Sequence, residues 1–190
     1  MSALITVPNA LTLLRFLGIP LFIHLALNLE ADGWAILVLV IGGATDYFDG
    51  KLARAWNQTS RFGEIADPAI DRLYIFAILV VFLVREILPL WMILVLIGRD
   101  LVLGVLTILL SRKSISALSV TYLGKAATFN LMYAFPLLLL AESDGLWGDL
   151  AFVTGWSFAI WGFALYISTG VGYARQAVAQ LRGSNVINSK

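Results

Sequence analysis

Four aspartates stand close together in the chain as two pairs, Asp46 with Asp49 and Asp67 with Asp71. Residues three or four positions apart share one face of a helix, so each pair places two carboxylates on one side of a helix. Four neighbouring carboxylates cannot all stay ionised unless cations neutralise them. Oxygen ligands select hard cations such as Mg²⁺, Mn²⁺ or Ca²⁺ over zinc or copper. The pattern therefore predicts a divalent-cation site.

The residues around these aspartates suit phosphate chemistry. Two hard cations close together activate an attacking oxygen and stabilise a leaving phosphate. Gly50 and Gly63 have no Cβ, which lets a phosphate or a nucleotide approach the backbone. Arg54 adds a planar, forked cation that matches phosphate oxygens. Together these residues predict a phosphoryl-transfer site.

Single members of the cluster also fit structural roles. Asp67 precedes Pro68, an order typical of a helix N-cap followed by the first helical residue. Asp46 could pair with Arg15 or Lys51 without any part in catalysis. A structural role is harder to accept for all four aspartates together with the arginine and both glycines.

The composition identifies the environment of this cluster. Of the 190 residues, 60% are hydrophobic and only 13% are charged, about half the charged fraction of a soluble domain. Because so few charged residues cannot cover the surface of a globular protein in water, we expect an integral membrane protein. The absence of cysteine excludes a disulfide framework and a thiolate zinc site. The net charge of +1 gives no indication of a nucleic-acid partner.

Six apolar stretches predict an all-α protein with six transmembrane helices. They are Ala10–Leu27, Trp34–Thr45, Pro68–Val84, Pro89–Leu110, Leu123–Leu140 and Leu146–Tyr173. We expect one domain over residues 1–175, followed by a polar cytoplasmic tail over 176–190.

The distribution of Lys and Arg predicts the orientation of these spans. Among the loops on one side, only the turn at Arg85 carries a basic residue. The other side carries Lys51, Arg54, Arg61, Arg112, Lys113, Lys125, Arg175, Arg182 and Lys190. Both termini and the aspartate cluster are therefore expected at the cytoplasmic face. Trp34, Trp91 and Trp147 at span edges fit the membrane interface.

The string D-x2-D-G-x2-A-R-x8-G-x3-D-x3-D, from Asp46 to Asp71, resembles the signature of the CDP-alcohol phosphatidyltransferases at every fixed position. The segment from Pro8 to Arg15 resembles the N-terminal segment of that family. The resemblance implies a membrane enzyme in which an acceptor hydroxyl displaces CMP from a CDP-linked lipid with the help of two divalent cations, Mg²⁺ or Mn²⁺. It also implies a homodimer.

The resemblance assigns roles by motif position. Asp46, Asp49, Asp67 and Asp71 would hold the metals, and Asp71 would also be the general base that takes the acceptor proton. The residues that would line the CDP site are Gly50, Ala53, Arg54 and Gly63.

CDP-diacylglycerol is the expected donor, and a second set of residues bears on the acceptor. Basic candidates for binding an acceptor phosphate are Arg72, Arg99, Arg112, Lys113 and Lys125. Arg112 and Lys113 could instead anchor a helix end at anionic headgroups, and Arg99 could form a structural ion pair. The pair Arg99-Asp100 and the stretch from Gly124 to Phe135 resemble actinobacterial members that make cardiolipin. Phosphatidylglycerol is therefore the expected acceptor, ahead of glycerol 3-phosphate and then inositol 1-phosphate.

A cation-coupled transporter is the alternative from another class, because its intramembrane carboxylates would also be functional. A transporter spreads such residues along a pathway through the bilayer. Here the acids gather at one cytoplasmic end, which favours an enzyme at the inner face of a bacterial cytoplasmic membrane.

Overall fold

The computed structural model describes residues 7–56, 61–113 and 121–187, and within them the side chains of 11–45, 67, 69–113 and 121–181. Every regular element in these ranges is helical. The all-α prediction is therefore confirmed for the described part of the chain, which divides into two compact units.

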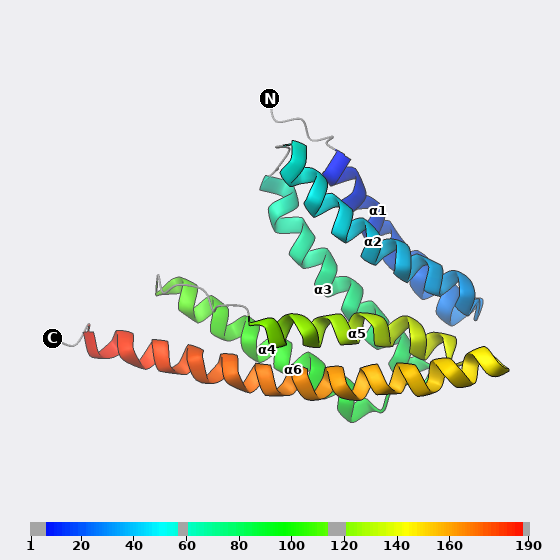
Figure 1. The fold of residues 1–190 in the computed structure, drawn as a ribbon. Helices are drawn as coiled ribbons and strands as arrows, with labels where there is room; N and C mark the ends of the chain where they lie inside the picture. Colours follow the sequence, from blue (N-terminus) through cyan, green and yellow to red (C-terminus); the bar gives the residue numbers. More distant parts are fainter. Residues whose placement is uncertain (1–6, 57–60, 114–120, 188–190) are drawn as a thin grey trace. The chain divides into compact units, whose positions relative to one another are not determined.

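The first unit contains α1 (Val7–Ile23), α2 (Asp32–Trp56) and α3 (Arg61–Val84), with the turn between α5 and α6. A π-helical turn (His24–Asn28) extends α1. Helix α1 packs against both α2 and α3 (Figure 1). The core of this unit includes the buried side chains of Phe22, Val81 and Phe82.

The second unit contains α4 (Leu90–Arg112) and most of α5 (Tyr122–Leu140) and α6 (Leu146–Ile187). Helix α6 packs closely on α5, because a Cβ on Gly162 would lie 2.9 Å from the Cβ of Asn130. It also packs on α4, where the rings of Trp91 and Phe163 meet edge to face. Small residues that allow such close approach are typical of helix pairs in membranes.

Four helical segments in the described part of the chain are long and apolar enough to cross a membrane, by length and composition: Leu11–Asn28, Leu90–Arg112, Tyr122–Leu140 and Leu146–Leu181. They correspond to four of the six predicted spans. The apolar part of α2 that is described, Asp32–Thr45, is shorter. The second and third spans and the orientation of the termini therefore stay predictions.

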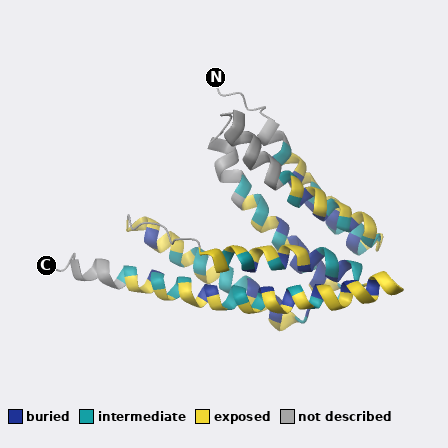
Figure 2. Ribbon diagram, viewed as in Figure 1, coloured by how far each residue is buried: buried dark blue, intermediate teal, exposed yellow. Residues whose placement is uncertain are grey.

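Large apolar side chains are exposed along these helices (Figure 2). The Trp34, Trp91 and Trp147 side chains near the starts of α2, α4 and α6 are all more than half exposed. A protein in water rarely leaves so much apolar surface uncovered, whereas lipid tails solvate it readily. The burial pattern thus agrees with a membrane environment.

Several helix boundaries differ from those expected. Helix α3 begins at Arg61 rather than at Pro68, so Asp67 lies inside the helix and the N-cap interpretation of Asp67 is wrong. Helix α6 continues past Tyr173 to Ile187, across the expected domain boundary at residue 175. Ala, Gln and Arg make up half of this continuation, and all three favour helix although the segment is polar.

Candidate active site

Helices α2 and α3 carry the whole aspartate motif. Because α2 continues to Trp56, Asp46 and Asp49 lie three positions apart on one helix, as expected. Gly50, Ala53 and Arg54 follow on the same helix, and Gly63 lies in the first turn of α3. The side chains of these six positions lie outside the described residues.

The two aspartates of α3 are both bound by side chains of α1. The Thr12 hydroxyl donates to Oδ1 of Asp67 at 2.6 Å, and the Arg15 guanidinium donates to Oδ1 of Asp71 at 2.6 Å. Thr12 and Arg15 are three residues apart on α1, and Asp67 and Asp71 are four apart on α3. The matching spacing aligns one polar stripe on each helix, so α1 fixes both carboxylates.

This polar contact is deeply buried on the α1 side. Thr12 is 1% exposed and Arg15 is 3% exposed, whereas the side chain of Asp71 is 43% exposed. The Arg15 cation, on the buried α1 side, therefore offsets the negative charge of Asp71, while the Asp71 side chain stays partly accessible. A buried arginine without a carboxylate would be strongly unfavourable, so the pair also constrains how α1 and α3 pack.

Sequence reasoning assigned no role to Thr12 and treated Arg15 only as an alternative partner for Asp46. The signal was present, because Thr12 and Arg15 are the polar residues in the first half of a largely apolar span and share one face. The spacing alone did not show which carboxylates would lie opposite them.

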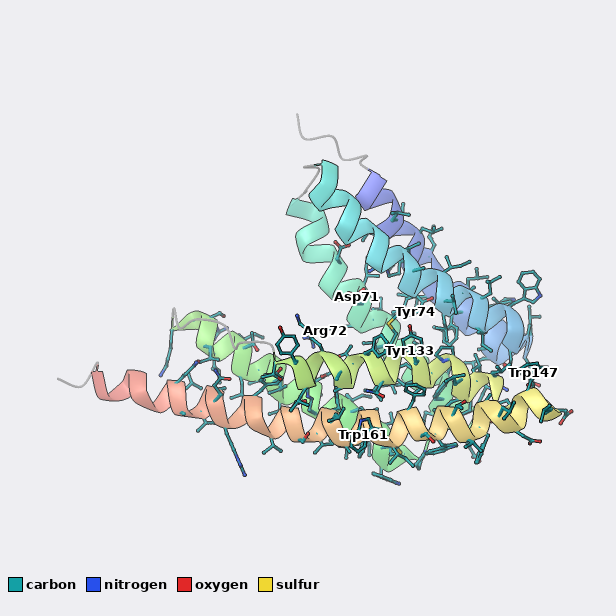
Figure 3. All side chains as sticks on the ribbon, viewed as in Figure 1. Asp71, Arg72, Tyr74, Tyr133, Trp147 and Trp161 are labelled. Atoms are coloured by element: carbon teal, nitrogen blue, oxygen red, sulfur yellow. The ribbon has the colours of Figure 1, made fainter. Side chains whose placement is uncertain are left out.

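Tyr74 of α3 holds three helices together one turn beyond Asp71 (Figure 3). Its hydroxyl donates to the backbone carbonyl of Val38 on α2 at 3.1 Å. A Cβ on Gly42 would lie 2.9 Å from the same hydroxyl oxygen, and Gly18 of α1 lies beside the ring. Gly42 thus lets α2 pack closely against a tyrosine of α3.

The five acceptor candidates fall in both units. Arg72 is an exposed residue of α3 in the first unit (Figure 3). Arg112 ends α4, Lys113 caps it, and Lys125 lies in the first turns of α5, all exposed. Arg72 thus belongs to the first unit, and the other four candidates belong to the second.

Arg99 lies in the interior of α4 and is held by its neighbours. Its guanidinium donates to Asp100 at 2.9 Å and lies over the ring of Tyr166 at 3.9 Å from the ring centroid. The Tyr166 hydroxyl donates to the same Asp100 oxygen at 2.5 Å. A Cβ on Gly170 would lie 2.9 Å from the arginine stem. Arg99 therefore forms its ion pair with Asp100 of the same helix, and Tyr166 of α6 contacts both residues.

Among the described side chains, no three of His, Cys, Asp and Glu gather as a metal site. Two of the four motif aspartates lie outside that set. The described pair fits a hard cation nevertheless, because both supply carboxylate oxygens from one helix face.

A sequence model of the CDP-alcohol phosphatidyltransferases matches residues 5–166, which include α1 to α5 and the first half of α6. The chain belongs to the CDP-alcohol phosphatidyltransferase family. It is therefore an enzyme that transfers a phosphatidyl-type group, and the transporter alternative is wrong.

Several named members of the family resemble this phosphatidyltransferase over most of its length. It is 52% identical over 177 residues to the cardiolipin synthase (CMP-forming) of Streptomyces coelicolor, covering 90% of this chain and 82% of the relative. It is 45% identical over 182 residues to a Mycobacterium tuberculosis protein provisionally named cardiolipin synthase, covering 95% and 87%. A glycerol-3-phosphate 3-phosphatidyltransferase of Blochmanniella floridana is 31% identical over 172 residues, covering 85% and 88%.

Proposed function

We propose that this phosphatidyltransferase is a cardiolipin synthase that uses CDP-diacylglycerol as donor and phosphatidylglycerol as acceptor. The proposal rests on the 52% identity to the Streptomyces relative of that name across 90% of the chain. The acceptor hydroxyl oxygen forms a bond to the phosphorus that carries diacylglycerol. The bond from that phosphorus to the bridging oxygen of the pyrophosphate breaks, and CMP leaves with the electron pair.

Asp71 is the proposed general base in this reaction. Its side chain is half-buried and accessible, and Arg15 fixes one of its oxygens from the α1 side. A carboxylate held in this way can face an incoming hydroxyl without rotating out of reach. The proton of the acceptor hydroxyl passes to Asp71 as the new oxygen–phosphorus bond forms.

Asp46, Asp49, Asp67 and Asp71 would hold two divalent cations, Mg²⁺ or Mn²⁺. Such ions, when bound, neutralise the pyrophosphate and stabilise the departing CMP. Thr12 supports this role, because its hydrogen bond orients the carboxylate of Asp67. Gly50, Ala53, Arg54 and Gly63 line the CDP site in this proposal, since their positions match those of the family motif.

Arg72, Arg99, Arg112, Lys113 and Lys125 form the proposed set of acceptor-binding residues. The exposed cations among them suit an anionic headgroup. The enzyme in this proposal crosses the bacterial cytoplasmic membrane six times, works at the cytoplasmic face with both termini inside, and forms a homodimer. The exposed tryptophans at the starts of α2, α4 and α6 support the placement of these helix starts at the membrane–water interface on the outer side.

CMP release by the purified enzyme tests the proposal. CDP-diacylglycerol and Mg²⁺ or Mn²⁺ are supplied with either phosphatidylglycerol or glycerol 3-phosphate, and the lipid product is identified. We expect CMP and cardiolipin with phosphatidylglycerol. Release with glycerol 3-phosphate alone would replace the proposed acceptor, in line with the Blochmanniella relative, and inositol 1-phosphate is the next acceptor to supply.

The base assignment has its own test. Asp71→Asn keeps the shape of the side chain but cannot take a proton, so we expect kcat to fall by about 10²- to 10⁴-fold. Asp149→Asn, at the start of α6, is the matched control and leaves kcat unchanged. Near-normal turnover of folded Asp71→Asn enzyme would show that another group accepts the proton.

A further inference from the structure

The first turn of α5 is built on Thr121. The Thr121 hydroxyl accepts a hydrogen bond from the backbone N–H of Gly124 at 3.2 Å, and its carbonyl accepts from the N–H of Lys125 at 3.1 Å. A threonine in this position satisfies backbone donors that a helix start leaves without intrahelical partners. The direction in which α5 begins therefore depends on where Thr121 is held.

Tyr173 of α6, which lies 52 residues after Thr121 in the chain, contacts Thr121 directly. The Tyr173 hydroxyl accepts from the Thr121 backbone N–H at 2.8 Å and lies 2.9 Å from the Thr121 hydroxyl. One phenol thus contacts both the backbone and the side chain of the capping residue.

Gly124 leaves the space that this phenol occupies. A Cβ added to Gly124 would lie 2.4 Å from the Tyr173 hydroxyl oxygen and 3.4 Å from the ring carbon that bears it. Real side chains do not approach so closely, so any other residue at 124 would displace the phenol or the helix start. Without the hydroxyl, the nearest Tyr173 atom would be at an ordinary contact distance.

Lys125, next to this glycine, is the proposed acceptor-binding cation on α5. Its side chain is exposed, and its ammonium lies 5.8 Å from the ring centroid of Tyr122 in the same turn. The backbone from which the Lys125 side chain extends is therefore set by a turn that Tyr173 fixes. Tyr173 lies after the family match, which ends at residue 166.

We propose that Tyr173 is a positioning residue for the acceptor, which acts by anchoring the first turn of α5 and with it Lys125. The inference rests on the proposed function, because it takes Lys125 as part of the acceptor site. Tyr173 does not touch the acceptor; it determines where the cation that binds the acceptor phosphate stands.

The test measures Michaelis constants for both substrates in the full-length enzyme. Tyr173→Phe keeps the ring and removes the hydroxyl with both of its contacts to Thr121, so we expect KM for phosphatidylglycerol to rise roughly three- to tenfold. KM for CDP-diacylglycerol and the melting temperature should stay unchanged. Tyr133→Phe is the matched control, because it removes a tyrosine hydroxyl from α5 in the same unit.

A pair of substitutions at Gly124 provides the sharper readout. Gly124→Ala should raise the acceptor KM more than Tyr173→Phe does, because the new methyl group meets the phenol oxygen. Adding Tyr173→Phe to Gly124→Ala removes that clash and should bring KM back to the Tyr173→Phe value. A double variant as impaired as the product of both single effects would overturn the proposal, as would an equal rise of both KM values in Tyr173→Phe.

Lys125→Met separates this inference from its premise. If Lys125→Met leaves the acceptor KM unchanged while wild-type enzyme makes cardiolipin, Lys125 is not an acceptor ligand and the positioning role is overturned. If the wild-type enzyme uses glycerol 3-phosphate instead, the same variants are measured with that acceptor. A selective rise in its KM would then support the role of Tyr173 although the proposed acceptor had failed.

Discussion

Arg15 of α1 and Asp71 of α3 form an ion pair with 2.6 Å between the guanidinium nitrogen and the carboxylate oxygen. The arginine is almost fully buried and the aspartate is partly exposed. A cation in the first helix thereby sets the orientation of the last aspartate of the motif. In the proposed mechanism, the N-terminal helix thus orients the general base although it carries none of the motif aspartates.

Replacement of Arg15 by Met should damage both activity and stability. The variant leaves the Asp71 carboxylate without its buried cation, and a hydrogen bond to a charged group contributes about 1.5–3 kcal/mol. We expect at least a tenfold loss of kcat and a lower melting temperature in detergent. Arg15→Lys keeps the charge but not the planar fork, so it should lie between Met and wild type. Wild-type kcat in Arg15→Met would contradict the role given to the pair.

Replacement of Thr12 by Val should lower the affinity for the metal more than it lowers the stability of the fold. Valine has nearly the shape of threonine but cannot donate to Asp67, and outer hydrogen bonds to metal ligands are worth about 10- to 100-fold in affinity. A titration of CMP release against Mg²⁺ or Mn²⁺ should show a higher half-saturating concentration, with similar turnover at saturation. Chelation of the metal should abolish activity in both proteins, and an unchanged titration curve would argue against this role for Thr12.

Arg85 joins three loops of the first unit at the end opposite to the aspartates. It forms a bidentate ion pair with Asp32 and lies 3.9 Å from Glu142. The hydrogen bond from Arg85 to Asp32 raises the pKa of the guanidinium above its ordinary value. A raised pKa stabilises the fold at every pH below the unfolded value, so this contribution persists between about pH 6 and pH 9.

Arg85→Gln should therefore lower the melting temperature without changing either KM. A double-mutant cycle with Asp32→Asn measures the coupling, for which we expect about 1 kcal/mol or more because both side chains are mostly buried. A selective change in the acceptor KM would place Arg85 near the substrate instead.

The proposed orientation can be mapped directly because the chain has no cysteine. A single cysteine introduced by Ser143→Cys, between α5 and α6, should react with a membrane-impermeant maleimide in intact cells. Lys113→Cys, after α4, should react only once the membrane is opened. The reverse labelling pattern would show that the topology is inverted. Labelling of both sites in intact cells would exclude the proposal that α4 ends on the cytoplasmic side.

The sequence predicted helical spans and a phosphoryl-transfer site because both depend on local patterns, and the resemblance of its motif to a known family implied the phosphatidyltransferase chemistry. Apolar runs identify spans, and the spacing from Asp46 to Asp71 is rigid. The sequence alone could not predict that Thr12 and Arg15 bind Asp67 and Asp71, because these contacts depend on how α1 and α3 align. The order Asp67-Pro68 predicts a helix start at Pro68, because proline is common at the first helical position. In the structure, Pro68 lies inside α3.

The length of α6 has a consequence for where the acceptor lies. From Leu150 to Ala174 the helix carries no charged side chain, and at 1.5 Å per residue this stretch is about 37 Å long. The hydrocarbon layer is about 30 Å thick, so the last neutral turn extends into the headgroup layer unless the helix tilts steeply. Tyr173 belongs to that turn. The glycerol hydroxyl of a phospholipid acceptor also lies in the headgroup layer, so the first turn of α5, which Tyr173 anchors, would meet the acceptor among the headgroups rather than in the aqueous phase.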